Sequence, residues 1–346
     1  MEPTERWVGR KLQVTGGSTF VVSLPKRWVS RSKLRAGETV FLSETGGGNL
    51  LLSPGEPGRR VLRSLTLRVA GPVEAREKLL RELIGAYVSG AAAVEIQFAP
   101  EVISDVRKTV RDFTRLVIGP EILEEGRTSI VVQDLSDPRE LSPEKGLRRM
   151  HLIAAGMHTD ALHALTTGDL TLSADVVARD EDVDRLFWMA AKQFSLTLVD
   201  PGHALRVGAD PTGGLHLWLA AKSMERIADH AARIANHALL LEGRKPRKEV
   251  AEGLRRASEI ALGVLGEAFE ALVSANMDLA HRALTTRRGL DRVLATVMNA
   301  VQGLRGAELL HLAAVAESLS RTADYATDIA ETAINHVVMR RLAAGA

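Results

Sequence analysis

Acidic residues recur at helical spacing in the second half of this 346-residue chain. Glu225 and Asp229 stand four positions apart, so on a helix their side chains share one face. A second acidic run, residues 180–184, contributes Asp180 and Asp184. Helical bundles build di-metal sites from carboxylates that converge from two helices. We therefore expect these four side chains to hold divalent or trivalent metal ions, with iron, zinc, magnesium and nickel all open, alone or together with phosphate.

The same spacing also allows ordinary surface ion pairs. Lys222 lies three positions before Glu225, and Arg233 lies four positions after Asp229. Such pairs on an exposed helix contribute only ~0.3–0.5 kcal/mol to stability and carry no chemistry. The residue types and spacing alone leave both interpretations open.

The acidic motif is repeated near the end of the chain. Residues 216–238 and 311–333 align at a constant offset of 95, and eleven of the 23 aligned positions are identical. Asp324 then corresponds to Asp229, and Asp328 follows Asp324 by four positions. Like charges at this spacing cost roughly 0.2–0.5 kcal/mol unless a cation offsets them. We therefore expect a second metal site at Asp324 and Asp328.

The second copy departs from the first at two of the acidic positions. Ser320 stands where the first copy has Glu225. The upstream segments align at an offset of 107, which places Arg287 where the first copy has Asp180. The acidic set is therefore less complete in the second copy than in the first.

The N-terminal part of the chain is strongly basic. Residues 6–37 contain eight Lys and Arg and no Asp or Glu, although the formal net charge of the whole chain is only +2. A small basic module on a mildly acidic body is typical of contact with a polyanion such as nucleic acid, and a solvated basic surface is the alternative. The candidate DNA-contacting residues are Arg10, Lys11, Lys26, Arg27, Arg31, Lys33 and Arg35.

Short strands are expected to position this basic module. Within residues 6–54, the alternation of Phe20, Val22 and Leu24 with their neighbours predicts a strand that ends at Pro25, and a helical turn follows it. So few strands do not close a stable core by themselves. We therefore expect a second copy of the chain to complete the core, which makes the protein a homodimer.

The remaining chain is predicted to contain a small α/β segment and a long helical part. Strands at 62–69, 93–98 and 129–132 alternate with helices at 73–88 and 100–117, which gives a β-α-β-α-β order over residues 60–138. Helical periodicity then covers 142–168, 173–196, 213–243, 247–275, 277–301 and 305–343. Because the motif repeats, we expect two tandem three-helix bundles, 139–245 and 246–346, in a mainly α, multi-domain protein.

Composition and motifs argue against several classes of function. The chain has no cysteine, which excludes disulfides, zinc–thiolate sites and cysteine nucleophiles. Its start has no signal-peptide pattern and no run of about 18 apolar residues is present, so we expect a cytoplasmic protein without membrane insertion. Glu308 and His311 form a single ExxH pair, whereas ferritin-like di-iron enzymes need two, and no Ser/His/Asp set is evident. We therefore do not expect an enzyme.

Two stretches of sequence resemble known families. ERIADHAARIA at 225–235 resembles the signature of PhoU proteins, and ARDEDVDRLFW at 178–188 is similar to the matching helix of that family, so the resemblance spans about 139–346. VTGGSTFVVSLPKRWVSRSKLRAGETVFL resembles the AbrB/SpoVT-type swapped-hairpin DNA-binding domain found in MazE-like antitoxins. Together with RLVIGPEILEE at 115–125, the chain is similar to archaeal-type PhoU regulators that carry an AbrB domain.

The resemblance implies a regulatory function. PhoU proteins bind metal clusters through an E/DxxxD motif on each bundle, which corresponds here to Glu225 and Asp229 and, in the second bundle, to Asp324. The family negatively regulates phosphate transport and phosphate-responsive signalling. The AbrB-like head implies dimerisation and DNA contact. The expected partners are DNA, a second copy of the chain, and a phosphate ABC transporter or signalling protein. An adaptor that docks on such a partner without binding DNA is the alternative.

Overall fold

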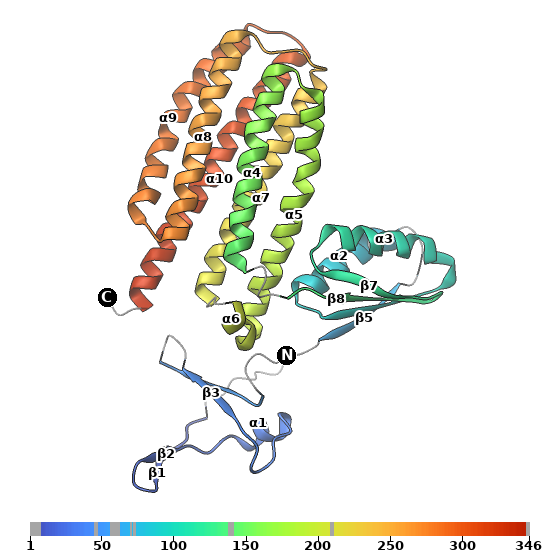
Figure 1. The fold of residues 1–346 in the computed structure, drawn as a ribbon, viewed down its shortest axis with the longest axis vertical. Helices are drawn as coiled ribbons and strands as arrows, with labels where there is room; N and C mark the ends of the chain where they lie inside the picture. Colours follow the sequence, from blue (N-terminus) through green and yellow to red (C-terminus); the bar gives the residue numbers. More distant parts are fainter. Residues whose placement is uncertain are drawn as a thin grey trace. The chain divides into compact units, whose positions relative to one another are not determined.

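A computed structural model describes residues 8–44, 48–55, 63–69, 71, 74–137, 142–207 and 211–343. The chain divides into two compact units (Figure 1). The first unit ends at Arg59 and the second begins at Arg60, and each is described by itself. The domain boundaries predicted near residues 60 and 139 fall in stretches outside the described residues. No helix in the described ranges is long and apolar enough to span a lipid bilayer.

The first unit consists of two small hairpins and one short helix. Strands β1 (Gln13–Thr15) and β2 (Thr19–Val21) pair antiparallel, and so do β3 (Phe41–Glu44) and β4 (Leu50–Ser53). Helix α1 (Lys26–Arg31) begins directly after Pro25, whose fixed φ of −61° suits the residue that precedes a helix. The predicted strand and helical turn are both present, but β2 ends at Val21 instead of continuing to Pro25.

The first unit leaves its apolar side chains exposed. Within 8–44 and 48–55, not one residue is buried. Val14 and Phe20, which lie opposite each other in the β1–β2 register, are 56% and 65% exposed, and Leu42 is 61% exposed. A folded monomer rarely leaves so many large apolar residues of one small unit in water.

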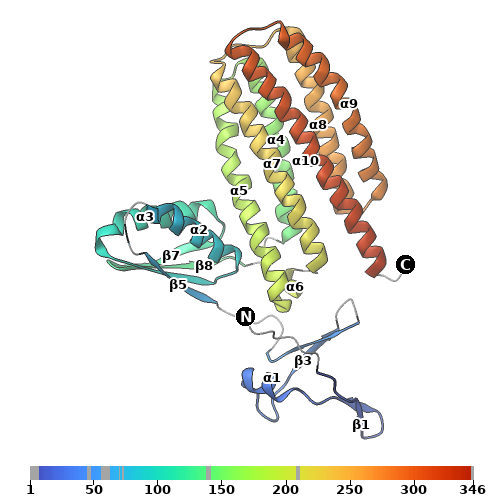
Figure 2. The same cartoon turned by 180° about the vertical axis from the view of Figure 1, so that it is seen from behind.

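The second unit opens with an α/β segment. Its strands are β5 (Ser64–Val69), β6 (Ala93–Phe98), β7 (Pro120–Glu125) and β8 (Ser129–Asp134), and its helices are α2 (Glu74–Val88), the 3-10 turn η1 (Pro100–Val102) and α3 (Ile103–Leu116). The sheet has the order β5-β6-β8-β7, with β5 parallel to β6 and the other pairs antiparallel. Figure 1 and Figure 2 show α2 and α3 on the same face of this sheet.

Strand β7 is absent from the predicted β-α-β-α-β order. Its sequence, PEILEE, contains three glutamates and opens with proline, so no apolar alternation marks it as a strand. The structure explains why this composition is tolerated. β7 lies at the edge of the sheet, and four of its six residues are exposed.

Six long helices make up the rest of the second unit. They are α4 (Pro143–Thr167), α5 (Leu170–Val199), α7 (Pro211–Leu240), α8 (Lys248–Ser274), α9 (Met277–Gln302) and α10 (Ala307–Ala343). All six predicted helices are present, and a short helix α6 (Pro201–Val207) lies between α5 and α7. Ser142 accepts a hydrogen bond from the backbone N–H of Lys145 and caps α4, as the sequence Ser-Pro-Glu predicts.

The helices form two triplets, α4-α5-α7 and α8-α9-α10. Within the triplets, α7 contacts α4 and α5, and α10 contacts α8 and α9. α7 and α10 also pack against each other, and Figure 2 shows them side by side where the two triplets meet. Met224, Ile227 and Ile234 of α7 are completely buried in one continuous core. The fold is therefore mainly helical, with duplicated three-helix bundles.

Candidate metal and nucleic-acid sites

The four predicted carboxylates of the first triplet lie at the edge of the α5–α7 contact. Asp180 and Asp184 are on α5, and Glu225 and Asp229 are on α7. All four are half-buried, whereas their acidic neighbour Glu181 is exposed. The apolar residues of both helices turn into the core beside them, so the helical period fixes the carboxylates next to the seam.

The four carboxylates repel one another across the two helices. Burial and the nearby charges of Asp184 and Asp229 raise the pKa of Asp180 to about 6. Burial, together with the charge of Asp229, raises the pKa of Glu225 to about 7, and Asp184 and Asp180 add to this effect. The pKa of Asp184 is raised by the same causes, burial first and Asp229 second. Structure therefore brings together the residues that sequence spacing selected.

A single arginine pairs with two of these carboxylates. The Nη1 atom of Arg226 lies 3.1 Å from Oδ2 of Asp229, and its Nε atom lies 3.4 Å from Oε2 of Glu225. The sequence spacing points to Lys222 and Arg233 as the partners, whereas the structure pairs both carboxylates with Arg226, which is adjacent to Glu225 and three positions before Asp229. Arg226 remains 49% exposed, and its ion pairs in the described residues are both with residues of α7.

The donor chemistry of the first triplet fits a hard cation. Four carboxylates supply oxygen ligands only, which suits Mg²⁺, Mn²⁺ and similar ions. Burial, and after it the neighbouring carboxylates, disfavour ionisation of Asp180 and Glu225, and a cation bound beside them would favour the ionised forms. Across the described part of the chain, however, no group of three or more His, Asp or Glu is drawn together in metal-binding geometry. Coordination therefore requires these side chains to turn towards one another.

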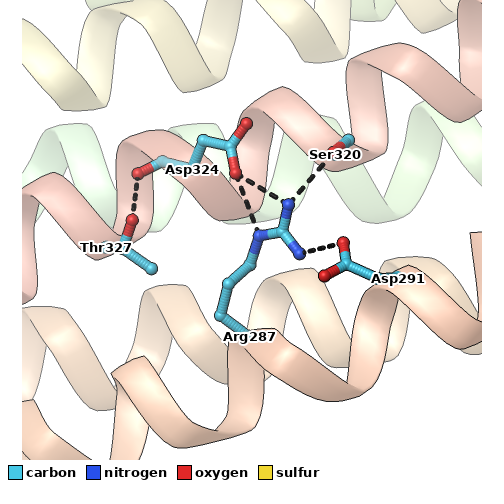
Figure 3. Close-up of polar contacts among 5 residues, drawn as sticks. All are labelled: Arg287, Asp291, Ser320, Asp324 and Thr327. Carbon is cyan, nitrogen blue, oxygen red and sulfur yellow. Dashed lines mark hydrogen bonds and ion pairs between the residues drawn. The ribbon is translucent and has the colours of Figure 1, made fainter.

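The equivalent position in the second triplet contains a guanidinium group. Arg287 on α9 extends to α10, where its Nε and Nη2 atoms lie 3.0 and 2.8 Å from Oδ1 of Asp324 (Figure 3). Nη2 also donates to Ser320 Oγ at 3.2 Å, and Nη1 donates to Asp291 Oδ1 at 2.6 Å. Burial alone would lower the pKa of Arg287, but its hydrogen bonds to Asp291 and Asp324 outweigh that effect and raise it.

Asp328, the other predicted ligand of the second triplet, lies elsewhere. It lines a cleft of about 650 Å³ between α7 and α10, across from Lys222 and Arg226. Burial, the charge of Glu331 and the charge of Asp324 raise the pKa of Asp328. The two residues of the predicted pair therefore lie in different surroundings. Asp324 bonds to Arg287, and Asp328 lines the cleft between α7 and α10.

The seven predicted DNA-contacting residues are all exposed in the first unit. Arg10 and Lys11 precede β1, whereas Lys26, Arg27 and Arg31 lie on α1 and Lys33 and Arg35 follow it closely. Five of the seven cations therefore belong to α1 and the four residues after it. Exposed Lys and Arg side chains gathered on one short element suit contact with nucleic-acid phosphates.

Family models match three stretches of the chain. Residues 147–238 and 254–333 match the PhoU domain. Residues 13–60 match the model described as antidote-toxin recognition MazE, bacterial antitoxin. Each PhoU match ends where a copy of the internal repeat ends, at residues 238 and 333.

Two curated relatives are described as PhoU homologs. A phosphate-specific transport system accessory protein PhoU homolog of Rhizobium meliloti is 22% identical over 186 residues, which are 52% of this chain and 77% of the relative. The homolog of that description from Caulobacter vibrioides is 28% identical over 110 residues, 32% of this chain, and the match spans only 44% of that relative.

Two crystal structures of PhoU proteins are similar at lower identity. PhoU from Pseudomonas aeruginosa has a TM-score of 0.48 and 19% identity, and the match covers 57% of this chain and 96% of that one. The phosphate transport system regulatory protein PhoU from Streptococcus pneumoniae has a TM-score of 0.46 and 18% identity, with 56% and 91% covered. The two PhoU-domain matches, which coincide with the internal repeat, show that the chain belongs to the PhoU family. A MazE-type domain precedes its two PhoU domains.

Proposed function

We propose that this protein is a phosphate-responsive regulator that binds DNA through its MazE-type unit and metal ions through its first PhoU domain. In this proposal the protein is a homodimer in the cytoplasm, is not an enzyme, and restrains phosphate uptake. The observation that carries the proposal is that one chain contains both a MazE-type unit with seven exposed Lys and Arg side chains and two PhoU domains. Such a chain can couple a nutrient signal to a gene.

Dimerisation through the first unit is part of this function. Val14, Phe20 and Leu42 are more than half exposed, although they lie in strands that should have an apolar side covered. A second copy of the same hairpins would cover these residues and would place two sets of cations about a two-fold axis. Two-fold symmetry in a DNA-binding protein matches the symmetry of a duplex.

Metal binding supplies the signal in this proposal. The candidate ligands are Asp180, Asp184, Glu225 and Asp229. Burial, together with the charges of the other carboxylates, raises the pKa of Glu225 to about 7, and a bound cation would offset the repulsion among these charges. Because the ligands lie on two helices, a bound ion links α5 to α7. A ligand that prefers one arrangement of two helices shifts their equilibrium towards that arrangement. Phosphate would bind the same ion as a further ligand.

DNA binding is tested with the full-length protein and labelled duplex fragments in a fluorescence-anisotropy titration at several salt concentrations. The Lys26→Ala/Arg31→Ala variant should lose at least about tenfold in affinity and about two units of slope in the logarithmic salt dependence, because each lost phosphate contact releases one counterion fewer. Arg255→Ala/Arg256→Ala, which removes two exposed cations from α8, is the matched control. Equal affinity and slope for both double variants would show that α1 does not bind DNA.

A second candidate function is an adaptor that docks on a phosphate transporter or a signalling protein. The curated relatives are named as accessory proteins of phosphate-specific transport systems, which favours this candidate. The two candidates separate in a strain that carries the chain without its first 59 residues. Phosphate-dependent transcription and control of uptake that both persist in this strain would favour the adaptor, and loss of phosphate-dependent transcription would favour the DNA-binding regulator.

A further inference from the structure

The two PhoU domains place different charges at the same four positions. The repeat pairs Asp180 with Arg287, and it pairs Glu225 with Ser320. At the two remaining positions both copies keep an aspartate: Asp184 and Asp229 in the first domain, and Asp291 and Asp324 in the second. The first domain therefore presents four carboxylates, whereas the second presents two carboxylates, one hydroxyl and one guanidinium.

In the second domain, the guanidinium bonds to the side chains at all three other positions. Arg287 donates to Asp291 on its own helix and to Ser320 and Asp324 on the facing helix (Figure 3). A cation held among the same positions would contact the same three side chains. Guanidinium is permanently charged and planar, and its fan of N–H donors suits carboxylate acceptors.

The side chain of Arg287 is more deeply buried than that of an ordinary surface arginine. The side chain of Arg287 is 17% exposed, whereas Arg226, which pairs with carboxylates of the first domain, is 49% exposed. Arg287 lies between α9 and α10 and connects them, while Arg226 bonds only to residues of its own helix. Arg287 therefore links α9 to α10, whereas the bonds of Arg226 in the described residues do not link α7 to α5.

The local charge balance points the same way. Two carboxylates and Arg287 give a formal charge of −1 in the second domain, so little electrostatic attraction for a metal ion remains. The four carboxylates of the first domain give −4 by the same count, which leaves out the arginine that both domains share, Arg226 in the first and Arg321 in the second. A divalent ion approaching Asp324 would also have to displace a guanidinium that is covalently attached to the chain and present at every metal concentration.

We propose that Arg287 takes the place of the metal in the second PhoU domain, so that this chain binds metal in its first domain only. The proposal rests on the proposed function for the metal of the first domain. It replaces the expectation of a second metal site at Asp324. The link between α9 and α10 is then permanent, and the link between α5 and α7 depends on metal. A change of metal concentration acts on one half of the duplicated body.

The first test counts metal sites with Mn²⁺, whose free form is measured by electron paramagnetic resonance during a titration of the full chain. Asp324→Asn/Asp328→Asn should retain the wild-type number of bound Mn²⁺ ions per chain. Glu225→Gln/Asp229→Asn should lose at least tenfold in Mn²⁺ affinity. A loss of bound Mn²⁺ in the Asp324/Asp328 variant would overturn the proposal.

The second test installs the charges of the first domain in the second. Arg287→Asp/Ser320→Glu recreates the four carboxylates, and it should double the number of Mn²⁺ sites per chain. Arg288→Asp/Ser320→Glu is the matched control, because Arg288 is the exposed neighbour of Arg287 and the change in charge is the same. If the Arg287 variant gains no site, or the control gains one equally, Arg287 does not stand in for the metal.

Hydrogen–deuterium exchange separates a failure of this proposal from a failure of the proposed function. On addition of Mn²⁺ to the wild-type protein, peptides of α5 and α7 should gain protection, and peptides around Arg287 and Asp324 should not change. Protection gained around Arg287 and Asp324 contradicts the proposal. No protection in α5 or α7 instead contradicts the metal of the proposed function, and the Arg287→Asp/Ser320→Glu count then decides the role of Arg287 by itself.

Discussion

Lys192 of α5 and Asp134, the last residue of β8, form an ion pair in which Nζ lies 2.9 Å from Oδ2 and only 4% and 6% of the two side chains are exposed. The ammonium also donates to Ser136 Oγ at 3.1 Å and lies 4.5 Å from the centre of the Tyr87 ring. Ser136 and Lys192 hold the pKa of Asp134 below its usual value, although burial opposes them. The pair joins the α/β segment to the helix that carries Asp180 and Asp184.

Removal of one partner should destabilise the second unit strongly. Lys192→Met leaves the carboxylate of Asp134 buried without its cation, and breaking a buried pair in this way costs about 3–5 kcal/mol. Urea unfolding of the variant should show this loss as a lower transition midpoint. Lys248→Met, at an 88% exposed lysine of α8, should change stability by no more than about 0.5 kcal/mol. Equal midpoints for the two variants would show that the pair is not structural.

His158 makes stability depend on pH in a definite direction. It is completely buried on α4, and its Nε2 atom lies 2.8 Å from Oγ1 of Thr322 on α10. Burial, together with the nearby His230, lowers the pKa of His158 from 6.5 to about 4. The unfolded chain therefore takes up a proton below about pH 6.5, while the folded chain does so only near pH 4. Stability contributed by the neutral ring is lost as pH falls through this window.

At pH 5, this linkage should cost the folded protein roughly 2 kcal/mol relative to pH 7. His158→Asn should reduce the difference in unfolding free energy between the two pH values, whatever its effect on stability at pH 7. His163→Asn, at an exposed histidine of the same helix, is the control. The pH difference is measured by urea unfolding, and a His158 variant with the wild-type pH difference would refute the assignment.

Sequence periodicity predicted the fold well and the side-chain pairing less well. The long helices follow from apolar spacing alone, and each carboxylate pair of the first domain shares one face of its helix because its members are four positions apart. Strand β7 was missed because an exposed edge strand needs no apolar pattern. The bond between Arg287 and Asp324 joins residues 37 positions apart on facing helices, so it depends on how α9 and α10 align. Lys192 and Asp134 are 58 positions apart, and nothing in their local sequence marks them as partners.

Neutralising Glu225 should stabilise the metal-free protein above neutral pH. The pKa of Glu225 rises from 4.5 to about 7 on folding, mainly through burial, so ionisation of the folded chain is unfavourable and stability is lost as pH rises through that range. Glu225→Gln removes this loss, and its advantage over the wild type should grow by roughly 2.5 kcal/mol between pH 5 and pH 8.

Mn²⁺ should reverse the order of stability at pH 8. The wild-type protein gains about 4.1 kcal/mol at a free metal concentration one thousand times the dissociation constant, which exceeds that advantage, and Glu225→Gln gains much less. Thermal unfolding with and without EDTA measures both effects. Glu249→Gln, at an exposed position of α8, should follow the wild type in every condition. If the Glu225 variant and the wild type respond equally to Mn²⁺, Glu225 is not a ligand.

A charge placed on the exposed apolar strands of the first unit should separate the proposed dimer. Phe20 is 65% exposed, and a glutamate there would be buried without a partner in a dimer that covers β1 and β2. Phe20→Glu should convert the protein to a monomer in sedimentation velocity and should lower its affinity for DNA. Leu152→Glu, at a 71% exposed leucine of α4, should leave the oligomeric state unchanged. A dimeric Phe20 variant would place the interface elsewhere.

Two glycines predict stability changes of opposite sign. Gly168 ends α4 with a φ of +74°, and a Cβ at this position would lie 2.5 Å from the backbone oxygen of Gly243. Gly168→Ala therefore combines backbone strain with a clash against rigid backbone, and it should cost at least about 1–3 kcal/mol.

Gly263 lies inside α8, where a Cβ meets nothing within 4 Å. Gly263→Ala should stabilise the protein by up to about 1 kcal/mol, because alanine restricts the unfolded chain and favours the helix. Urea unfolding of the two variants should move the midpoint in opposite directions, and an unchanged or raised midpoint for Gly168→Ala would show that α4 and the segment after α7 do not approach so closely.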